Sequence, residues 1–305
     1  MGFKDKVVIT CALTGVLANR KQCAAIPYTP VEIAEDAKRA YDAGAAVVHI
    51  HARNDDGSPS FEPAVFARIK EEIRKRCPII LNFSTGTILD DVSLQVTTLE
   101  ESRPEIAALN MGTMNYSKYS KSRKQFVFDM VFPNTYGKII KLLDAMNAAG
   151  VKPELECFDT GHTQGTSPLM DMGKLVAPMQ FSFIVNVLGG IPAEVESLQL
   201  QSRIMPQGQA WEVIGISHCH WRMLATALVL GGNIRTGLED HLYLPGGEMA
   251  ANNGSMVETA AQLTRLTGRE PATVEEARVL LGLGERTAGR LAAEEVGHAA
   301  STGGA

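Results

Sequence analysis

The chain has 305 residues, of which 45% are hydrophobic and 21% are charged, and its formal net charge is -5. This ordinary globular composition, with both charge signs interspersed, offers no basic surface for nucleic acid and no polybasic membrane anchor. No apolar run approaches the roughly 20 residues that span a bilayer and the N-terminus lacks the apolar stretch of a signal peptide, so we expect a cytoplasmic protein with a small-molecule ligand.

Short β-rich apolar runs alternate with amphipathic helical stretches along the chain, which is the pattern of βα units around a parallel sheet. The first helix has the clearest start signal, because Thr29, Pro30 and Glu32 stand where an N-cap, an N1 proline and an N3 acid belong, and the helix is expected to end at Gly44. The expected strands are eight: 7–12, 46–51, 79–83, 106–111, 154–158, 180–187, 211–216 and 233–238.

Eight strands with eight crossovers predict an α/β fold of the (β/α)8 TIM-barrel type in one domain, residues 1–286. A doubly wound open sheet is the alternative, although no glycine-rich nucleotide fingerprint follows the first strand. Two segments fall outside the alternation. Residues 112–136 are expected to form a long loop, which is a functional or disordered kind of connection, and residues 287–305 to form a flexible C-terminal tail.

Polar residues gather where the expected strands end, and in such barrels the active site lies at the C-terminal ends of the strands. In chain order they are Thr14; His49 and His51; Asn82, Ser84, Thr85 and Gly86; Asn110 and Thr113; Glu156; and Arg235, Glu239 and Asp240. We therefore expect the chemistry at this end of the barrel.

His49 and His51 are two residues apart on an expected strand, so both imidazoles project from one face and could hold one metal ion. Glu239 is the best third ligand, because the second and eighth strands both neighbour the first in a closed barrel. Two imidazoles, one carboxylate and an open position form a catalytic zinc set, although the same donors suit ferrous iron. The bland alternatives are histidines that merely end a strand and a Glu239 that caps a helix.

A second histidine pair, His218 and His220, follows the seventh strand. The chain there reads as the start of a helix, where residues two apart diverge by about 200°. This pair is therefore a weaker candidate for a shared metal. Glu156 also has a structural alternative, burial beside Arg53 as an ion pair inside the barrel.

Arg235 and Asp240 form the expected acid–base pair at the eighth strand. A carboxylate near a guanidinium has a lowered pKa and stays ionised, so that Asp240 could act as a base; an ordinary ion pair that closes the barrel is the alternative. Ser84 and Thr113 offer hydroxyl donors for a developing oxyanion, or serve as turn residues.

These residues lie in segments whose order and spacing resemble the β-keto acid cleavage enzymes, the family that includes 3-keto-5-aminohexanoate cleavage enzyme. The segments are Ile9 to Gly15, His49-Ile50-His51, Ser84-Thr85-Gly86, Leu109 to Thr113 and Gly232 to Asp240. The similarity runs from about Lys6 to Gly284, and it is the succession of segments over the whole barrel that is specific.

The resemblance implies a zinc-dependent Claisen-type exchange, in which a β-keto acid and acetyl-CoA become acetoacetate and a new acyl-CoA, carried out by a homo-oligomer, commonly a tetramer. It implies that His49, His51 and Glu239 hold the zinc and that Asp240, paired with Arg235, removes a proton from C2 of the keto acid. Ser84 and Thr113 would stabilise oxygen-bearing intermediates, and the substrate site would be lined by Thr14, Leu17, Asn82, Thr85, Gly86, Asn110 and Glu156.

One departure from the family concerns specificity. The aminohexanoate-cleaving type has an acidic residue after the first Thr-Gly motif, where it can pair with the ammonium group of the substrate, and Leu17 occupies that position here. An apolar residue cannot compensate a desolvated cation, so a 5-amino substrate is disfavoured. A neutral chain suits Leu17, and an acidic chain could reach Arg20 or Lys21. The basic cluster from Lys118 to Lys124 is a candidate for the CoA phosphates.

Three other classes of protein remain as alternatives. Amidohydrolase-like TIM barrels use a similar histidine pair, but at strand one and with further histidines later in the chain. Ferrous oxygenases use the same three donors, usually on an antiparallel jelly roll. A metal-stabilised binding scaffold would not need a base, metal ligands and hydroxyls crowded at one barrel end.

Overall fold

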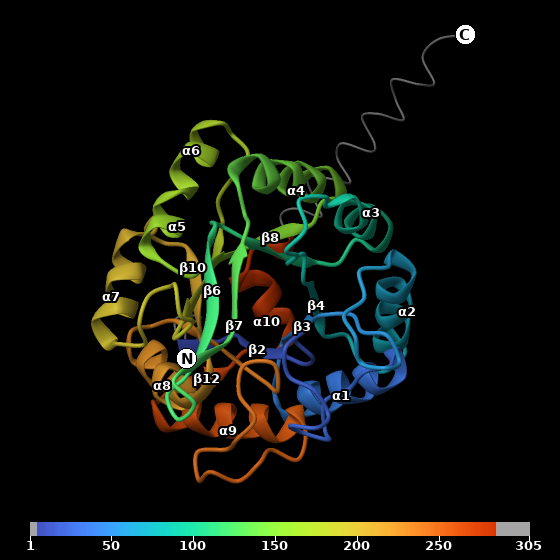
Figure 1. The fold of residues 1–305 in the computed structure, drawn as a ribbon, viewed down its shortest axis with the longest axis vertical. Coiled ribbons are helices and arrows are strands. Elements are labelled where there is room, and N and C mark those ends of the chain that lie inside the picture. Colours follow the sequence, from blue (N-terminus) through green and yellow to red (C-terminus); the bar gives the residue numbers. More distant parts are fainter. Residues whose placement is uncertain (1–4, 285–305) are drawn as a thin grey trace.

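The computed structural model describes residues 5–284, and eight parallel strands within them close into a barrel (Figure 1). The barrel strands are β2 (Ile9–Ala12), β3 (Val47–Ile50), β4 (Ile80–Phe83), β5 (Ile106–Asn110), β8 (Lys152–Cys157), β9 (Gln180–Val185), β10 (Ala210–Gly215) and β11 (Asn233–Thr236). Pairing of β11 with β2 completes the circle. The predicted (β/α)8 barrel is confirmed and the open-sheet alternative is wrong. The expected tail at 287–305 lies outside the described residues.

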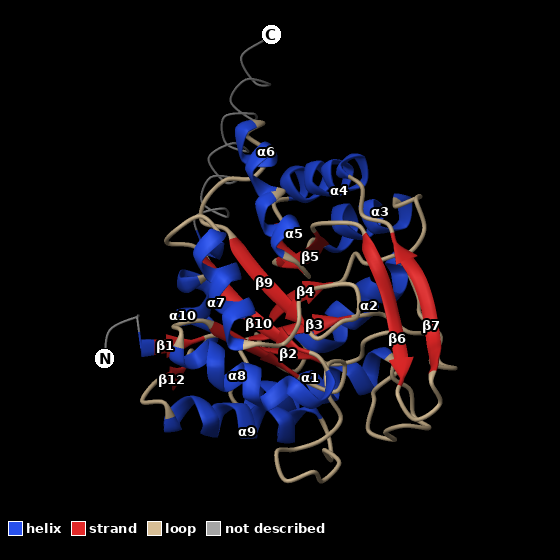
Figure 2. Ribbon diagram, turned by 60° about the vertical axis from the view of Figure 1, so that its left-hand side comes forward, coloured by secondary structure: helices blue, strands red, loops and turns tan. Residues whose placement is uncertain are grey.

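The helices lie around the outside of the barrel, apart from the last one, which covers the N-terminal ends of its strands (Figures 1 and 2). They are α1 (Pro30–Ala43), α2 (Pro63–Arg74), α3 (Ser93–Ser102), α4 (Tyr136–Ala149), α5 (Thr160–Gln164), α6 (Thr166–Asp171), α7 (Val195–Ile204), α8 (His220–Val229), α9 (Asn253–Leu266) and α10 (Val274–Leu280). A short parallel pair, β1 (Lys6–Val7) with β12 (Glu270–Pro271), lies outside the barrel sheet. Within residues 5–284, no helix is long and apolar enough to cross a membrane.

Helix α1 begins and ends as predicted. The Thr29 hydroxyl accepts from the Glu32 amide at 3.3 Å while the Glu32 carboxylate accepts from the Thr29 amide at 2.9 Å, which is a capping box. Gly44 ends the helix in the left-handed conformation, with φ of 111°. The capping box and the C-terminal glycine therefore set the two ends of the helix that connects β2 to β3.

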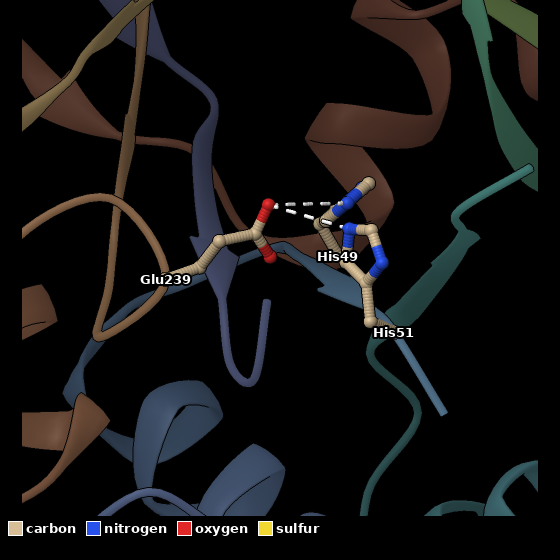
Figure 3. A group of neighbouring side chains, drawn as sticks. All are labelled: His49, His51 and Glu239. Carbon is tan, nitrogen blue, oxygen red and sulfur yellow. Dashed lines mark ion pairs between the residues drawn. The ribbon is translucent and has the colours of Figure 1, made fainter. Parts of the chain in front are cut away.

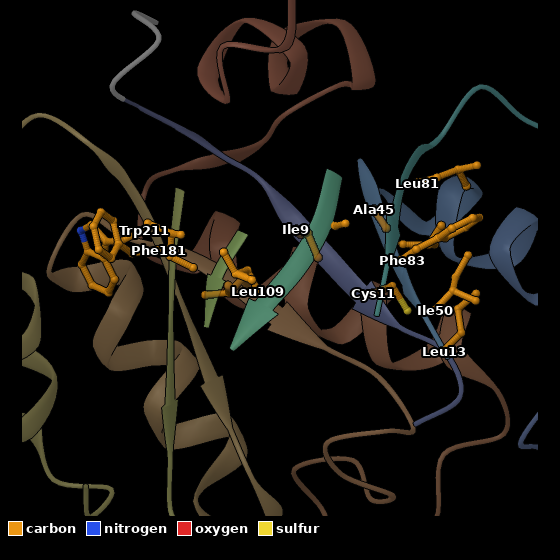
Figure 4. Close-up of a cluster of buried hydrophobic side chains, with 14 of the residues drawn as sticks. Ile9, Cys11, Leu13, Ala45, Ile50, Leu81, Phe83, Leu109, Phe181 and Trp211 are labelled. Atoms are coloured by element: carbon orange, nitrogen blue, oxygen red, sulfur yellow. The ribbon is translucent and has the colours of Figure 1, made fainter. Parts of the chain in front are cut away.

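The main hydrophobic core lies between the barrel and the helices, and is built from alternate strand residues (Figure 4). On β2, for example, Ile9 and Cys11 are fully buried in this core. The intervening residue Thr10 contacts Glu212 of β10 across the barrel interior. Apolar residues on the outward face thus drive folding, and polar side chains such as Thr10 and Glu212 lie in the barrel interior.

The segment expected to be a long loop at 112–136 is an antiparallel hairpin instead, and that prediction was wrong. Strands β6 (Met114–Ser120) and β7 (Gln125–Phe132) pair from Met114 opposite Phe132 to Ser120 opposite Gln125. Figure 2 shows the hairpin beside the barrel. Aromatic side chains hold it there, because Tyr116 packs edge-on against Phe158 with ring centroids 6.0 Å apart. The alternation of β7 is that of a strand, but the lysines around the turn conceal it.

Candidate active site

Three side chains that could hold a metal ion meet at the C-terminal end of the barrel (Figure 3). Nε2 of His49 lies 3.7 Å and Nε2 of His51 lies 3.4 Å from Oε1 of Glu239. Their potential ligand atoms all lie within 4.8 Å of one another. The strand order β11–β2–β3 brings them together, as expected from the sequence. Glu239 does not cap a helix, because a turn follows it and α9 begins only at Asn253.

The protonation of these groups suits a metal ligand set. Burial lowers the pKa of His49 well below its ordinary value, which keeps the imidazole neutral and able to donate a lone pair. Burial alone would raise the pKa of Glu239, but the Arg235 guanidinium holds it well below the usual range. Two imidazoles and one carboxylate are the donors of a catalytic zinc site, so the residues fit this metal.

The loop after β2 shapes the ligand set. The Thr14 hydroxyl donates to the His51 carbonyl at 2.7 Å and accepts from the His51 amide at 3.0 Å, which fixes the backbone just beyond β3. The Gly15 amide donates to Oε2 of Glu239 at 3.1 Å. A Cβ on Gly15 would lie 2.7 Å from Cγ of Glu239, and the φ of Gly15 is +55°. Only glycine allows this approach without strain.

Gly15→Ala is therefore expected to weaken metal binding, because the new methyl group displaces Glu239. The measurement is the zinc dissociation constant, obtained by competition with a chelator. Gly173→Ala is the matched control, since Gly173 also has a positive φ, +69°, but nothing lies within 4 Å of its Cβ position. Both variants lose stability through backbone strain, of roughly 1–2 kcal/mol. Equal zinc affinity in the two variants would contradict the role given to Gly15.

Arg235 is the centre of a buried group of carboxylates. Its Nε and Nη2 donate to the two oxygens of Asp240 at 3.0 and 2.9 Å, Nη2 also donates to Glu239 at 2.6 Å, and Nη1 lies 3.4 Å from Glu156. The expected pair of Arg235 and Asp240 is thus present. The alternative that joined Glu156 to Arg53 is wrong, because Arg53 donates to backbone carbonyls, including that of Gly15.

Asp240 has a raised pKa, although we expected Arg235 to lower it. Burial raises the pKa of Asp240 to about 6 and outweighs the nearby guanidinium. Burial and the neighbouring Glu154 likewise raise the pKa of Glu156 to about 8. Near pH 7 Asp240 is therefore the ionised group and Glu156 the protonated one. A carboxylate with a pKa of about 6 is a stronger base than an ordinary aspartate.

The other expected site residues are engaged to different degrees. Ser84 accepts from the Gly86 amide at 3.2 Å and Thr113 accepts from the Asn134 amide at 2.9 Å, so each hydroxyl keeps its hydrogen for another acceptor. Thr85 is buried and donates to the Ala108 carbonyl. Asn110 is buried close to Gly86, because a Cβ added to Gly86 would lie 3.4 Å from Nδ2 of Asn110. Asn82 points into the barrel and donates to Glu154, and Leu17 is 53% exposed.

The rival pair at His218 and His220 does not form a shared site. His220 is fully buried, with Nδ1 2.8 Å from the Gly215 carbonyl and Nε2 2.9 Å from the Thr236 hydroxyl. His218 is exposed on the short 3₁₀ turn that precedes α8. Both ring nitrogens of His220 are therefore occupied.

Two groups of site residues were missed in the sequence. Tyr116, on the hairpin, has its pKa raised to about 12 by burial and by the charges of Glu239 and Glu156. Glu154 and Glu212 are buried inside the barrel. Recognising β7 as a strand would have revealed the hairpin, whose other strand, β6, carries Tyr116. The positions of Glu154 and Glu212 within expected strands would have revealed the buried glutamates.

Comparison with known proteins gives four findings. A family model described as beta-keto acid cleavage enzyme matches residues 6–283. The 3-keto-5-aminohexanoate cleavage enzyme of Fusobacterium nucleatum is 36% identical over 280 residues, 92% of this chain and 98% of that protein. The 3-oxoadipate:acetyl-CoA acetyltransferase of Cupriavidus necator is 34% identical over 281 residues, 90% of this chain and 94% of that protein. The apo structure of ObcA shares the fold with a TM-score of 0.70 at 20% identity, over 85% of this chain and 65% of that one.

Proposed function

The chain belongs to the beta-keto acid cleavage enzyme family, and from this premise we propose that it is a zinc-dependent acyltransferase acting on a β-keto acid and acetyl-CoA. The products are acetoacetate and the acyl-CoA of the remaining chain. One observation carries the proposal. His49, His51 and Glu239 share one Arg235-centred cluster with Asp240, so a metal site and a base lie side by side at the barrel end.

His49, His51 and Glu239 would hold the zinc, which supplies a Lewis acid for the carboxylate and ketone oxygens of the keto acid. Asp240, with a pKa of about 6, takes the proton from C2. Arg235 grips both oxygens of Asp240 and so orients this base. Hydroxyls of Ser84 and Thr113 donate to oxygens that gain negative charge during the exchange.

The acyl exchange has four steps, of which the removal of the C2 proton by Asp240 is the first. The carbanion at C2 attacks the thioester carbonyl of acetyl-CoA and expels the CoA thiolate. The thiolate adds to the original ketone carbon, the bond between that carbon and C2 breaks, and the acyl-CoA leaves. The acetoacetate carbanion then takes back a proton from Asp240. The base therefore ends the cycle in the form in which it began.

A panel of β-keto acids with acetyl-CoA tests this function. The panel holds neutral straight chains of increasing length, a 5-amino acid and a dicarboxylic acid, and acetoacetate and CoA esters are read out together. We expect at least one neutral member to give both products in equal amounts. Acetoacetate formation by none of them, in zinc-loaded protein, would overturn the proposal.

Leu17 and Arg20 support a neutral chain in the substrate. Leu17 offers no charge to an ammonium group, and the Arg20 guanidinium already forms an ion pair with Glu32 at 2.7 Å. Its guanidinium also lies 4.2 Å from the centre of the Tyr28 ring. Two of the side chains that could select a charged substrate are thus apolar or already paired.

Leu17→Glu is expected to raise kcat/KM for a 5-amino β-keto acid by about 10–150-fold, because a charge-assisted hydrogen bond contributes roughly 1.5–3 kcal/mol. Val16→Glu is the control, since Val16 is the exposed neighbour and receives the same charge. An unchanged substrate preference in Leu17→Glu, or an equal gain in Val16→Glu, would show that specificity lies elsewhere.

Two further expectations complete the proposal. The phosphates of CoA would meet exposed basic residues around the hairpin turn, which are Lys118, Lys121, Arg123 and Lys124.

The protein would assemble as a homotetramer. Exposed apolar residues on the hairpin support association, such as Phe126 and Val131, which are 54% and 58% exposed. Sedimentation velocity measures the assembly directly.

A further inference from the structure

A network of polar side chains fills the barrel interior beneath the three ligands. We call Thr10, Asn82, Glu154, Ser182 and Glu212 the inner network; all five are buried, with at most 2% exposed. Thr10 donates to Oε2 of Glu212 at 2.7 Å, Ser182 lies 2.6 Å from Oε1 of Glu154, and Asn82 donates to Oε2 of Glu154. Polar groups are retained in such an interior only when hydrogen bonds compensate their burial. The mechanism proposed above uses none of these residues.

The inner network reaches the ligand set through Asn82. His49 and Asn82 are neighbours in register on β3 and β4. Nε2 of His49 faces Glu239, while Nδ1 of His49 and Oδ1 of Asn82 are buried and lack a hydrogen-bond partner of normal geometry within the described part of the chain. Burial lowers the pKa of His49, and the Asn82 amide opposes this shift, as an acceptor close to the ring does. Two buried polar atoms without a partner thus belong to residues that are neighbours in register on adjacent strands.

The direction of each hydrogen bond follows from the chemistry of the groups. The amide nitrogen of Asn82 donates to Glu154, so its oxygen is the atom left for His49. An amide oxygen only accepts, so Nδ1 of His49 must carry the hydrogen. A neutral imidazole has one N–H, and the other nitrogen, Nε2, then holds its lone pair towards Glu239.

We propose that Asn82 is a positioning residue that holds His49 in its Nδ1-protonated form and so presents Nε2 to the metal, with Glu154 fixing the orientation of the Asn82 amide. Outer hydrogen bonds of this kind typically account for about 10–100-fold in metal affinity. The inference rests on the metal site of the proposed function, which zinc binding by the unaltered protein tests separately.

Asn82→Leu removes the acceptor while keeping a side chain of similar size. We expect its zinc dissociation constant, measured by chelator competition, to rise about 10–100-fold. Thr10→Val is the matched control, because it removes a buried hydrogen bond of the same network without touching His49. Its zinc affinity should stay that of the unaltered protein, and thermal unfolding of both metal-free variants shows whether they fold. Equal zinc affinity in the two variants would overturn the proposal.

The double substitution N82D/E154Q keeps an acceptor for His49 and a hydrogen bond between the two altered positions. We expect it to recover most of the zinc affinity lost in Asn82→Leu. Nitrogen-15 NMR of the zinc-loaded unaltered protein, which needs no variant, should find a hydrogen on Nδ1 of His49. Metal on Nδ1, or no recovery in a folded double variant, would overturn the role of Asn82. Absence of zinc binding in the unaltered protein would instead overturn the proposed metal site.

Discussion

Asp240→Asn is expected to bind zinc normally and to lose formation of the CoA ester by about 10²–10⁴-fold, the usual contribution of a positioned general base. The asparagine keeps the size of the side chain and an oxygen for Arg235, so the ligand set should remain in place. What is lost is a carboxylate whose pKa, about 6, makes it an effective proton acceptor. Incorporation of deuterium at C2 of the keto acid, followed by NMR, isolates this step from the acyl exchange.

Asp144→Asn controls for the loss of a carboxylate, because Asp144 is exposed and paired with Lys174 at the surface. It should exchange and turn over like the unaltered protein. Near-normal deuterium incorporation in Asp240→Asn would remove Asp240 from the mechanism. Glu156 is not an equivalent base, since its pKa of about 8 keeps it protonated near pH 7.

The second large effect concerns the metal. Purified protein should contain about one zinc per chain. His49→Ala should lose this zinc, because a catalytic zinc site has three protein ligands and the variant keeps two of them. His218→Ala is the control, since this exposed histidine belongs to the rival pair. Elemental analysis after gel filtration gives the metal content. Full zinc content in His49→Ala, or loss of zinc in His218→Ala, would contradict the assignment of His49 as a zinc ligand.

The sequence predicted those parts of the fold that local patterns control. The capping box at Thr29 and Glu32 and the glycine at 44 decide where α1 begins and ends, whatever surrounds them. The alternation of side chains along a strand and the order of the strands likewise predicted which residues meet at the site. His49 and His51 share a face, and a closed barrel with β11 beside β2 brings Glu239 to them.

The remainder depends on quantities that no local pattern carries. The pKa of Asp240 is set by competition between its burial and Arg235, and the sequence gives the partner but not the degree of burial. Gly15 was recognised only as part of a motif, because its closeness to Glu239 joins residues 224 positions apart. The role of Asn82 likewise becomes visible only once Glu154 lies across the barrel. The hairpin was missed because its turn is rich in lysines.

Acyl exchange at the Arg235-centred site is the central claim, and one isotope experiment tests it directly. The zinc-loaded protein is given its best β-keto acid from the panel and acetyl-CoA with carbon-13 at both acetyl carbons, and the products are followed by NMR. The mechanism predicts acetoacetate labelled at C3 and C4 together with an unlabelled acyl-CoA. Label that stays in acetyl-CoA or appears in acetate while the keto acid disappears would contradict it.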